Sequence, residues 1–192
     1  MILASQSPRR QELLAKLGVV FKVFPAAIEE PPPAPGTSPA EYAQSLARLK
    51  AAWVAERHPQ EVVLAADTIV VAQGKILGKP KDAAEAYQML SLLSGAEHEV
   101  ITAYALLGGG ECTSRFVKTT VLFKALTPLE IQAYLATGEP FDKAGAYAIQ
   151  GIASYMVKEI RGSVTNVIGL PLFEVVEDLL EWKIIAFKGE RA

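Results

Sequence analysis

The chain has 192 residues, of which 51% are hydrophobic and 21% are charged, and these values are typical of a globular enzyme. This length suits a single domain over residues 1–192, or two lobes around one cleft, and excludes a need for disulfides to stabilise the fold. The formal net charge of −2 argues against nucleic acid as a partner, and no segment approaches the roughly 18 consecutive apolar residues of a membrane span.

The first half of the chain is predicted to alternate short strands and helices. Ser7 and Pro8 are typical of an N-cap and a first helical position, and Gly18 ends the helix that they begin. A later apolar run, rich in β-branched residues, predicts a central strand buried on both faces. In chain order we expect a strand at 2–4, a helix at 8–17, a strand at 19–24, a proline-rich loop, a helix at 38–58, and a strand at 61–72 with a turn into residues 76–77.

The second half is predicted to contain a long hairpin. Three glycines at 108–110 join two β-rich segments, and they do not form a phosphate-binding loop because neither a Gly-Lys-Ser/Thr ending nor a helix follows them. The expected elements are a helix at 82–93, strands at 100–107 and 116–126, a helix at 127–138 and a helix at 171–180, with an irregular glycine-rich stretch before the last. Strands and helices mix without strict alternation, so the predicted fold class is α/β with a mixed sheet flanked by helices.

Cysteine and histidine carry little of the expected chemistry. Cys112 is the single cysteine, which excludes an intrachain disulfide and fits a reducing, cytoplasmic compartment. The two histidines, His58 and His98, are too few and too far apart to indicate a zinc site. For His98 a structural role is favoured over contact with a ligand.

Two arginines near the N-terminus break a local rule. Arg9 and Arg10 occupy the second and third positions of the predicted first helix, where the helix dipole favours acidic residues. Free backbone amides, the hydroxyls of Ser5 and Ser7 and two guanidinium groups are together suited to holding a polyphosphate. The alternative is that both arginines lie on a solvated helix face.

An acidic residue interrupts the predicted central strand. Asp67 lies between apolar runs, and a buried carboxylate without a partner costs several kcal/mol. A metal ion, a catalytic water or a lysine could be that partner, and a partly buried carboxylate is a reasonable general base. Lys79, held between Gly78 and Pro80 just beyond this strand, is a candidate phosphate contact, although a plain turn explains the same pattern.

Other polar residues are weaker candidates. Glu30 could contribute a carboxylate to a magnesium site, because Mg²⁺ prefers hard oxygen ligands, but acidic residues before prolines are often only solvated. Lys50 lies in an apolar helix segment, where a lysine that extends its charge to solvent is the common explanation. Gln150 belongs to a glycine-rich loop at 138–151 that has the composition of a binding loop, and its amide can read a base edge.

Taken together, these segments resemble the ordered signatures of the Maf family of nucleotide pyrophosphatases. The resemblance spans most of the chain, and it implies a two-lobed α/β fold of the Maf or inosine-triphosphatase type, with a deep cleft and often a homodimeric state. The motifs that carry it are Ser5-x-Ser7-Pro8-Arg9-Arg10, Ala66-Asp67-Thr68-Ile69-Val70, Gly78-Lys79-Pro80, Leu93-Ser94-Gly95-x-x-His98-x-Val100-x-Thr102, Asp142-Lys143-Ala144-Gly145-Ala146-Tyr147-x-Ile149-Gln150-Gly151 and Asn166-Val167-x-Gly169-Leu170-Pro171.

The resemblance also implies a reaction. Members hydrolyse a nucleoside triphosphate between the α and β phosphates with a divalent metal, Mg²⁺ or Mn²⁺. Asp67 matches the family's proposed proton acceptor and is, with Glu30, the expected metal ligand. Arg10, Lys50 and Lys79 match its basic positions.

Three further positions separate the substrate subgroups of the family. This sequence has Arg9, Thr68 and Gln150 there, the set that resembles the subgroup acting on dTTP and UTP, whereas the methylated-GTP subgroup typically has Trp in place of Arg9. The resemblance therefore favours a dTTP/UTP pyrophosphatase. A nucleotide-binding regulator of septum formation, acting through partners, is the alternative, and a phosphatase that releases orthophosphate is a second one.

Overall fold

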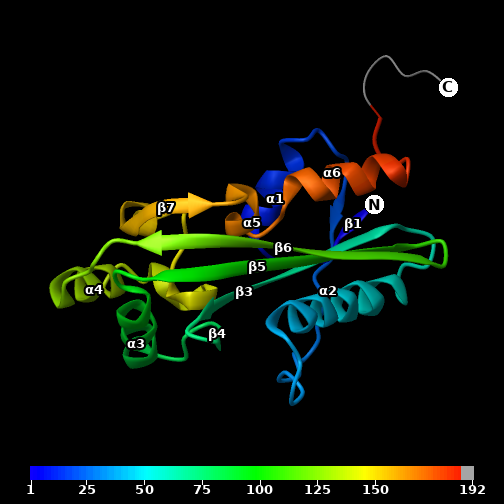
Figure 1. Cartoon of the computed structure of the whole chain (residues 1–192). Coiled ribbons are helices and arrows are strands. Elements are labelled where there is room, and N and C mark those ends of the chain that lie inside the picture. The colour runs from blue at the N-terminus through cyan, green and yellow to red at the C-terminus, as the bar shows by residue number, and fades with distance from the viewer. Residues whose placement is uncertain (187–192) are drawn as a thin grey trace.

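The computed structural model describes residues 1–186 and is built on one curved, mixed β-sheet (Figure 1). The strand order is β2-β1-β3-β5-β6-β7, and β4 pairs with the far end of β3. The pairs β2-β1 and β1-β3 are parallel, and the remaining pairs are antiparallel. The strands are β1 (Ile2–Leu3), β2 (Lys22–Val23), β3 (Val63–Ala72), β4 (Lys75–Leu77), β5 (Glu97–Gly108), β6 (Glu111–Phe123) and β7 (Val157–Arg161).

Helices cover both faces of this sheet. In Figure 1, α2 lies below the sheet, α1, α5 and α6 lie above it, and α3 and α4 lie at its other end. The α-helices are α1 (Pro8–Ala15), α2 (Pro39–Ala55), α3 (Ala83–Leu93), α4 (Pro128–Leu135), α5 (Val164–Ile168) and α6 (Leu172–Glu181), and three short 3-10 helices are η1 (Glu139–Asp142), η2 (Ala144–Ala146) and η3 (Ile152–Met156). No helix in residues 1–186 is long and apolar enough to cross a membrane.

The alternation of side chains along β3 divides the core between the two faces. Val63 and Ala65 pack with α2, whereas Leu64 and Ala66 pack with α1 and α6. Further along the strand, Val70 belongs to a third cluster, which α3, α4 and the 3-10 helices complete. Because successive residues of a strand point to opposite faces, one strand supports all three clusters, and its midpoint lies where they meet.

The prediction of a central buried strand is confirmed, because every residue of β3 except Thr68 is buried. Other expectations were wrong in extent. The strand predicted at 19–24 is reduced to two exposed residues, and the second arm of the hairpin begins at Glu111 rather than at 116. The stretch expected to be irregular contains β7 and α5. Its strand is at the sheet edge and mostly exposed, so its sequence has no apolar alternation to indicate it.

Asn166 fixes α5 and the loop that follows it at Gly169. Its side-chain oxygen accepts a hydrogen bond from the backbone N–H of Thr102 at 3.0 Å, and its side-chain nitrogen donates to the Val100 carbonyl and the Thr119 hydroxyl, both at 2.9 Å. The residue is fully buried. These bonds attach α5, and the loop that follows it, to the middle of the sheet.

Candidate functional site

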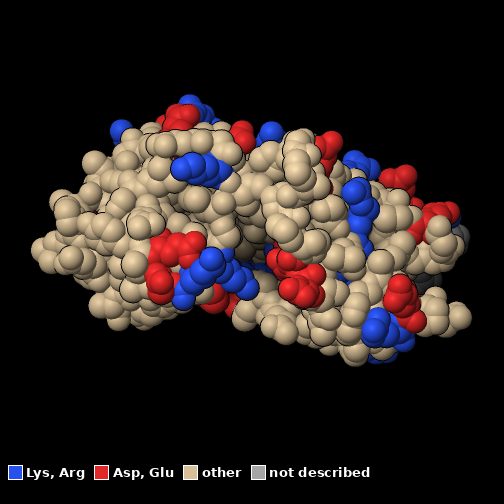
Figure 2. Space-filling model, turned by 90° about the horizontal axis from the view of Figure 1, so that it is seen from below, with Lys and Arg blue, Asp and Glu red and all other residues tan. Residues whose placement is uncertain are grey.

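A cavity of about 740 Å³ opens between the two halves of the molecule. Figure 2 shows its mouth as a dark hollow with acidic and basic side chains beside it. The strand ends, the N-terminus of α1, the face of α2 and the loops around η1 and α5 all contribute to its lining. Nine of the residues singled out from the sequence line it: Ser5, Ser7, Arg9, Arg10, Glu30, Lys50, Asp67, Thr68 and Lys79.

On one side of the cavity, a single lysine contacts two carboxylates. The Lys50 ammonium lies 2.5 Å from Asp67 Oδ1 and 2.7 Å from Glu30 Oε1. The side chains of Asp67 and Lys50 are only 10% and 14% exposed, whereas that of Glu30 is 49% exposed. The buried carboxylate therefore has a lysine as its partner in this structure, and Lys50 turns its charge into the site rather than toward bulk solvent.

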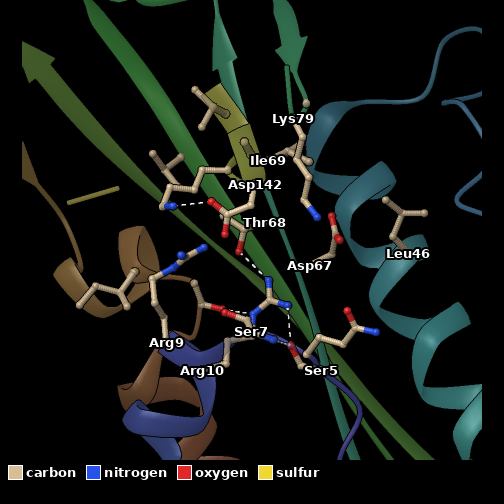
Figure 3. A pocket seen from close by; sticks show the side chains of 18 of the residues that line it. Ser5, Ser7, Arg9, Arg10, Leu46, Asp67, Thr68, Ile69, Lys79 and Asp142 are labelled. Atoms are coloured by element: carbon tan, nitrogen blue, oxygen red, sulfur yellow. Dashed lines mark hydrogen bonds and ion pairs between the residues drawn. The ribbon is translucent and has the colours of Figure 1, made fainter. Parts of the chain in front are cut away.

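Lys79 approaches the same carboxylate from the opposite direction. It follows β4 and is exposed, and Figure 3 shows its side chain extending toward Asp67. The backbone N–H of Gly145 donates to the Gly78 carbonyl at 3.0 Å, which ties this turn to the loop around η2. Gly145 has a φ of 69°, and a Cβ there would lie 2.9 Å from Val70 Cγ2, so only glycine permits this approach.

The N-terminus of α1 differs from those of α2 and α4. In α2 and α4 the third helical position is Glu41 or Glu130, which completes a capping box. In α1 that position is Arg10, and the Ser7 hydroxyl makes no capping bond. The first-turn amides and this hydroxyl therefore have no capping partner and could bind an anion at the cavity.

Arg10 is fixed by three hydrogen bonds. Its Nε donates to the Gly169 carbonyl at 2.7 Å, its Nη1 to Ser5 Oγ at 3.2 Å and its Nη2 to Thr68 Oγ1 at 3.0 Å. Burial lowers the pKa of Arg10, and the nearby charge of Asp67 opposes that effect. A guanidinium has five N–H groups, so this arrangement orients the side chain and leaves N–H groups for a phosphate.

The opposite side of the cavity carries a second charged group, formed by Arg9, Asp142 and Lys143. Lys143 donates to the Asp142 carboxylate and, at 2.7 Å, to the Glu139 carbonyl. Burial by itself raises the pKa of Asp142, but Lys143, through its hydrogen bond and its charge, and Arg9, through its charge, outweigh this effect and hold the pKa below its ordinary value. Figure 3 shows Arg9 and Asp142 pointing toward one another.

Sequence reasoning assigned no individual role to Asp142 or Lys143, although both line the cavity. The sequence feature that could have identified them is an adjacent acidic and basic residue inside a glycine-rich loop. Gln150, which was singled out, is exposed and does not line the cavity, while the adjacent Ile149 does. The structural interpretation of His98 agrees with the structure, since it is buried and its Nε2 lies 2.8 Å from the Tyr147 hydroxyl.

The acidic residues fit one mode of divalent-metal binding. Among residues 1–186 no group of three or more His, Cys, Asp or Glu side chains converges. Glu30 and Asp67 do converge, because both contact the same lysine nitrogen. Mg²⁺ is commonly bound by one or two carboxylates together with substrate phosphates, so this pair fits a metal that arrives with a nucleotide.

The fold belongs to a known structural class. The Ham1 protein of Staphylococcus aureus has the same architecture with a TM-score of 0.54, although only 12% of the aligned residues are identical, and the match covers 95% of this chain and 98% of that one. The predicted Maf or inosine-triphosphatase type of α/β fold is thereby confirmed.

Sequence comparison gives the family. The family model described as "Maf-like protein" matches residues 1–182. Proteins described as "dTTP/UTP pyrophosphatase" are 56% identical in Geobacter sulfurreducens, 54% in Halalkalibacterium halodurans and 46% in Syntrophus aciditrophicus. The first two matches cover 93% of this chain and 94% of each relative, and the third covers 100% and 94%. The chain belongs to the Maf family.

Proposed function

We propose that the protein hydrolyses dTTP and UTP to the monophosphate and pyrophosphate. Its enzyme class, nucleoside triphosphate pyrophosphatase, is that of relatives 46–56% identical to it. The observation that carries the proposal is the position of the buried carboxylate of Asp67 in the same cavity as the free N-terminus of α1. One group can activate water while the other holds a polyphosphate.

The mechanism follows from these positions. Asp67 orients a water molecule and accepts its proton as that water attacks the α-phosphorus. Arg10, Lys50 and Lys79 stabilise the negative charge that moves onto the departing pyrophosphate. Phosphoryl transfer depends mainly on positioning and charge stabilisation. The hydrogen bonds that fix Arg10 therefore support catalysis by holding its guanidinium in one orientation.

A divalent cation is part of the same proposal. Asp67 and Glu30 are the residues that would hold Mg²⁺ or Mn²⁺ when a nucleotide is bound. The cation would neutralise phosphate oxygens and act as a Lewis acid there. Lys50 contacts both carboxylates, so a cation bound between them would free its ammonium for the phosphates.

Location and assembly complete the proposal. A single free cysteine, exposed on β6, supports a reducing, cytoplasmic compartment. The substrate is a free nucleotide rather than a nucleic acid, because a net charge of −2 gives no overall attraction for a polyanion. A homodimer is the proposed assembly, and the mass in solution measured by light scattering tests it.

The direct test is a panel of nucleotides with product analysis. The purified protein is incubated with Mg²⁺ and dTTP, UTP, CTP, GTP, ATP or 7-methyl-GTP, and pyrophosphate is separated from orthophosphate. Monophosphate and pyrophosphate, formed fastest from dTTP and UTP, are expected. Orthophosphate would identify a phosphatase instead, and nucleotide binding with no turnover would favour a regulator of septum formation.

A further inference from the structure

The charged group opposite Asp67 has a defined order of donors and acceptors. Asp142 lies beside Lys143, which is only 12% exposed, while the Asp142 side chain is 70% exposed and lines the cavity. On its other side is Arg9, for which no hydrogen bond or ion pair is found within residues 1–186. The wall therefore presents a cationic donor, a carboxylate acceptor and a second cationic donor.

At the other two subgroup positions, Thr68 and Gln150, the side chains are engaged or distant. The Thr68 hydroxyl accepts from Arg10 at 3.0 Å and lies 2.9 Å from the Thr102 hydroxyl. The Gln150 side chain is exposed outside the cavity. Arg9 is thus the one residue of the three subgroup positions that faces the cavity with free donors, and its charge acts on Asp142 there.

This order complements one type of base edge. Uracil and thymine present an acceptor, a donor and an acceptor, namely O4, N3–H and O2, whereas cytosine presents a donor at N4 and an acceptor at N3. A carboxylate facing cytosine N3 would meet a lone pair instead of a proton. Guanine adds a second donor, so it would leave one of the two cationic groups without an acceptor.

We propose that Asp142 is a specificity-determining residue that accepts the N3–H of uracil or thymine, while Lys143 and Arg9 donate to the two flanking carbonyl oxygens. This inference rests on the proposed function and adds the group that selects the base. Because uracil and thymine share this edge, one arrangement serves both UTP and dTTP. Lys143 also holds the Asp142 carboxylate in place, because its ammonium donates both to that carboxylate and to the Glu139 carbonyl.

The first experiment compares UTP with its N3-methylated analogue, which has no N3–H. The unaltered protein should hydrolyse the analogue with a kcat/KM at least about tenfold lower, since a charged acceptor loses its donor and meets a methyl group. In Asp142→Ala the two substrates should become nearly equal. If Asp142→Ala discriminates between them as strongly as the unaltered protein does, the base is not read by Asp142.

The second experiment exchanges the acceptor for an amide. Asp142→Asn can donate to cytosine N3 but still accept from uracil N3–H, and a cationic donor still faces cytosine N4, so the ratio of kcat/KM for UTP to that for CTP should fall about threefold or more without inverting. Glu177→Gln, an exposed carboxylate on α6 outside the cavity, is the matched control and should leave the ratio unchanged. An unchanged ratio in Asp142→Asn, or a parallel fall for both nucleotides, would overturn the proposal.

These outcomes are separable from failure of the proposed function. Pyrophosphate release from any nucleotide shows that the reaction itself is intact, and only the ratios report on Asp142. If Asp142→Asn melts well below the unaltered protein, the N3-methyl comparison in the unaltered protein still decides, because equal rates for the two nucleotides would refute the assignment.

Discussion

Replacing Asp67 by Asn should separate catalysis from folding. The amide cannot accept a proton from water, and loss of a general base lowers kcat by about 10²- to 10⁴-fold, which corresponds to roughly 3–5 kcal/mol in the activation barrier. Nucleotide binding should persist, because the α1 N-terminus and Arg10 are untouched. Nucleotide binding is measured by calorimetry and turnover by pyrophosphate release.

The expected change in stability is smaller and follows from the ion pairs. Removing one partner of a buried pair typically costs about 3–5 kcal/mol, because the other charge is left without compensation. Here Lys50 keeps Glu30, which lies 2.7 Å away but is half-exposed, so we expect Asp67→Asn to lower the free energy of unfolding by about 1–3 kcal/mol. Urea unfolding measures this difference.

A second buried carboxylate provides the matched control. Asp178 is fully buried on α6, accepts from the Tyr104 hydroxyl at 2.5 Å and lies 2.6 Å from Arg115 Nη2, away from the cavity. Asp178→Asn should cost about 1–3 kcal/mol of stability with kcat/KM retained. If folded Asp67→Asn kept a rate within about threefold of the unaltered protein, the general-base assignment would be refuted.

Three other predictions concern the support of the site. Arg10→Lys should lower kcat/KM at least about tenfold and the melting temperature as well, because one ammonium cannot reproduce the fork that contacts the Gly169 carbonyl; kinetics and thermal melts test this. Burial lowers the pKa of His98 to about 4, so its stabilising contribution is complete above pH 6.5 and is lost as the pH falls toward 4; urea midpoints across this range should depend less on pH in His98→Gln. Gly145→Ala should destabilise the fold by about 1–3 kcal/mol and reduce turnover, because it requires an unfavourable φ and displaces Val70; unchanged melting would contradict this reading.

The sequence determined the local features of the protein. The N-cap and proline of α1, the buried strand β3 and the break in its apolar pattern at Asp67 depend on neighbouring residues, and local reasoning identified all three. The ordered motifs were also sufficient to indicate the family. They could do so because each motif is short and its residues are close in sequence.

The tertiary structure decided which residues meet. Lys50 is 17 positions from Asp67 and Arg10 is 159 from Gly169, and no local pattern indicates such contacts. The edge strand β7 was missed because half-exposed charged residues show no apolar period. The wall formed by Arg9 and Asp142 likewise exists only after folding, since long-range packing of the sheet, α1 and the η1 loop brings two distant charges to one cavity.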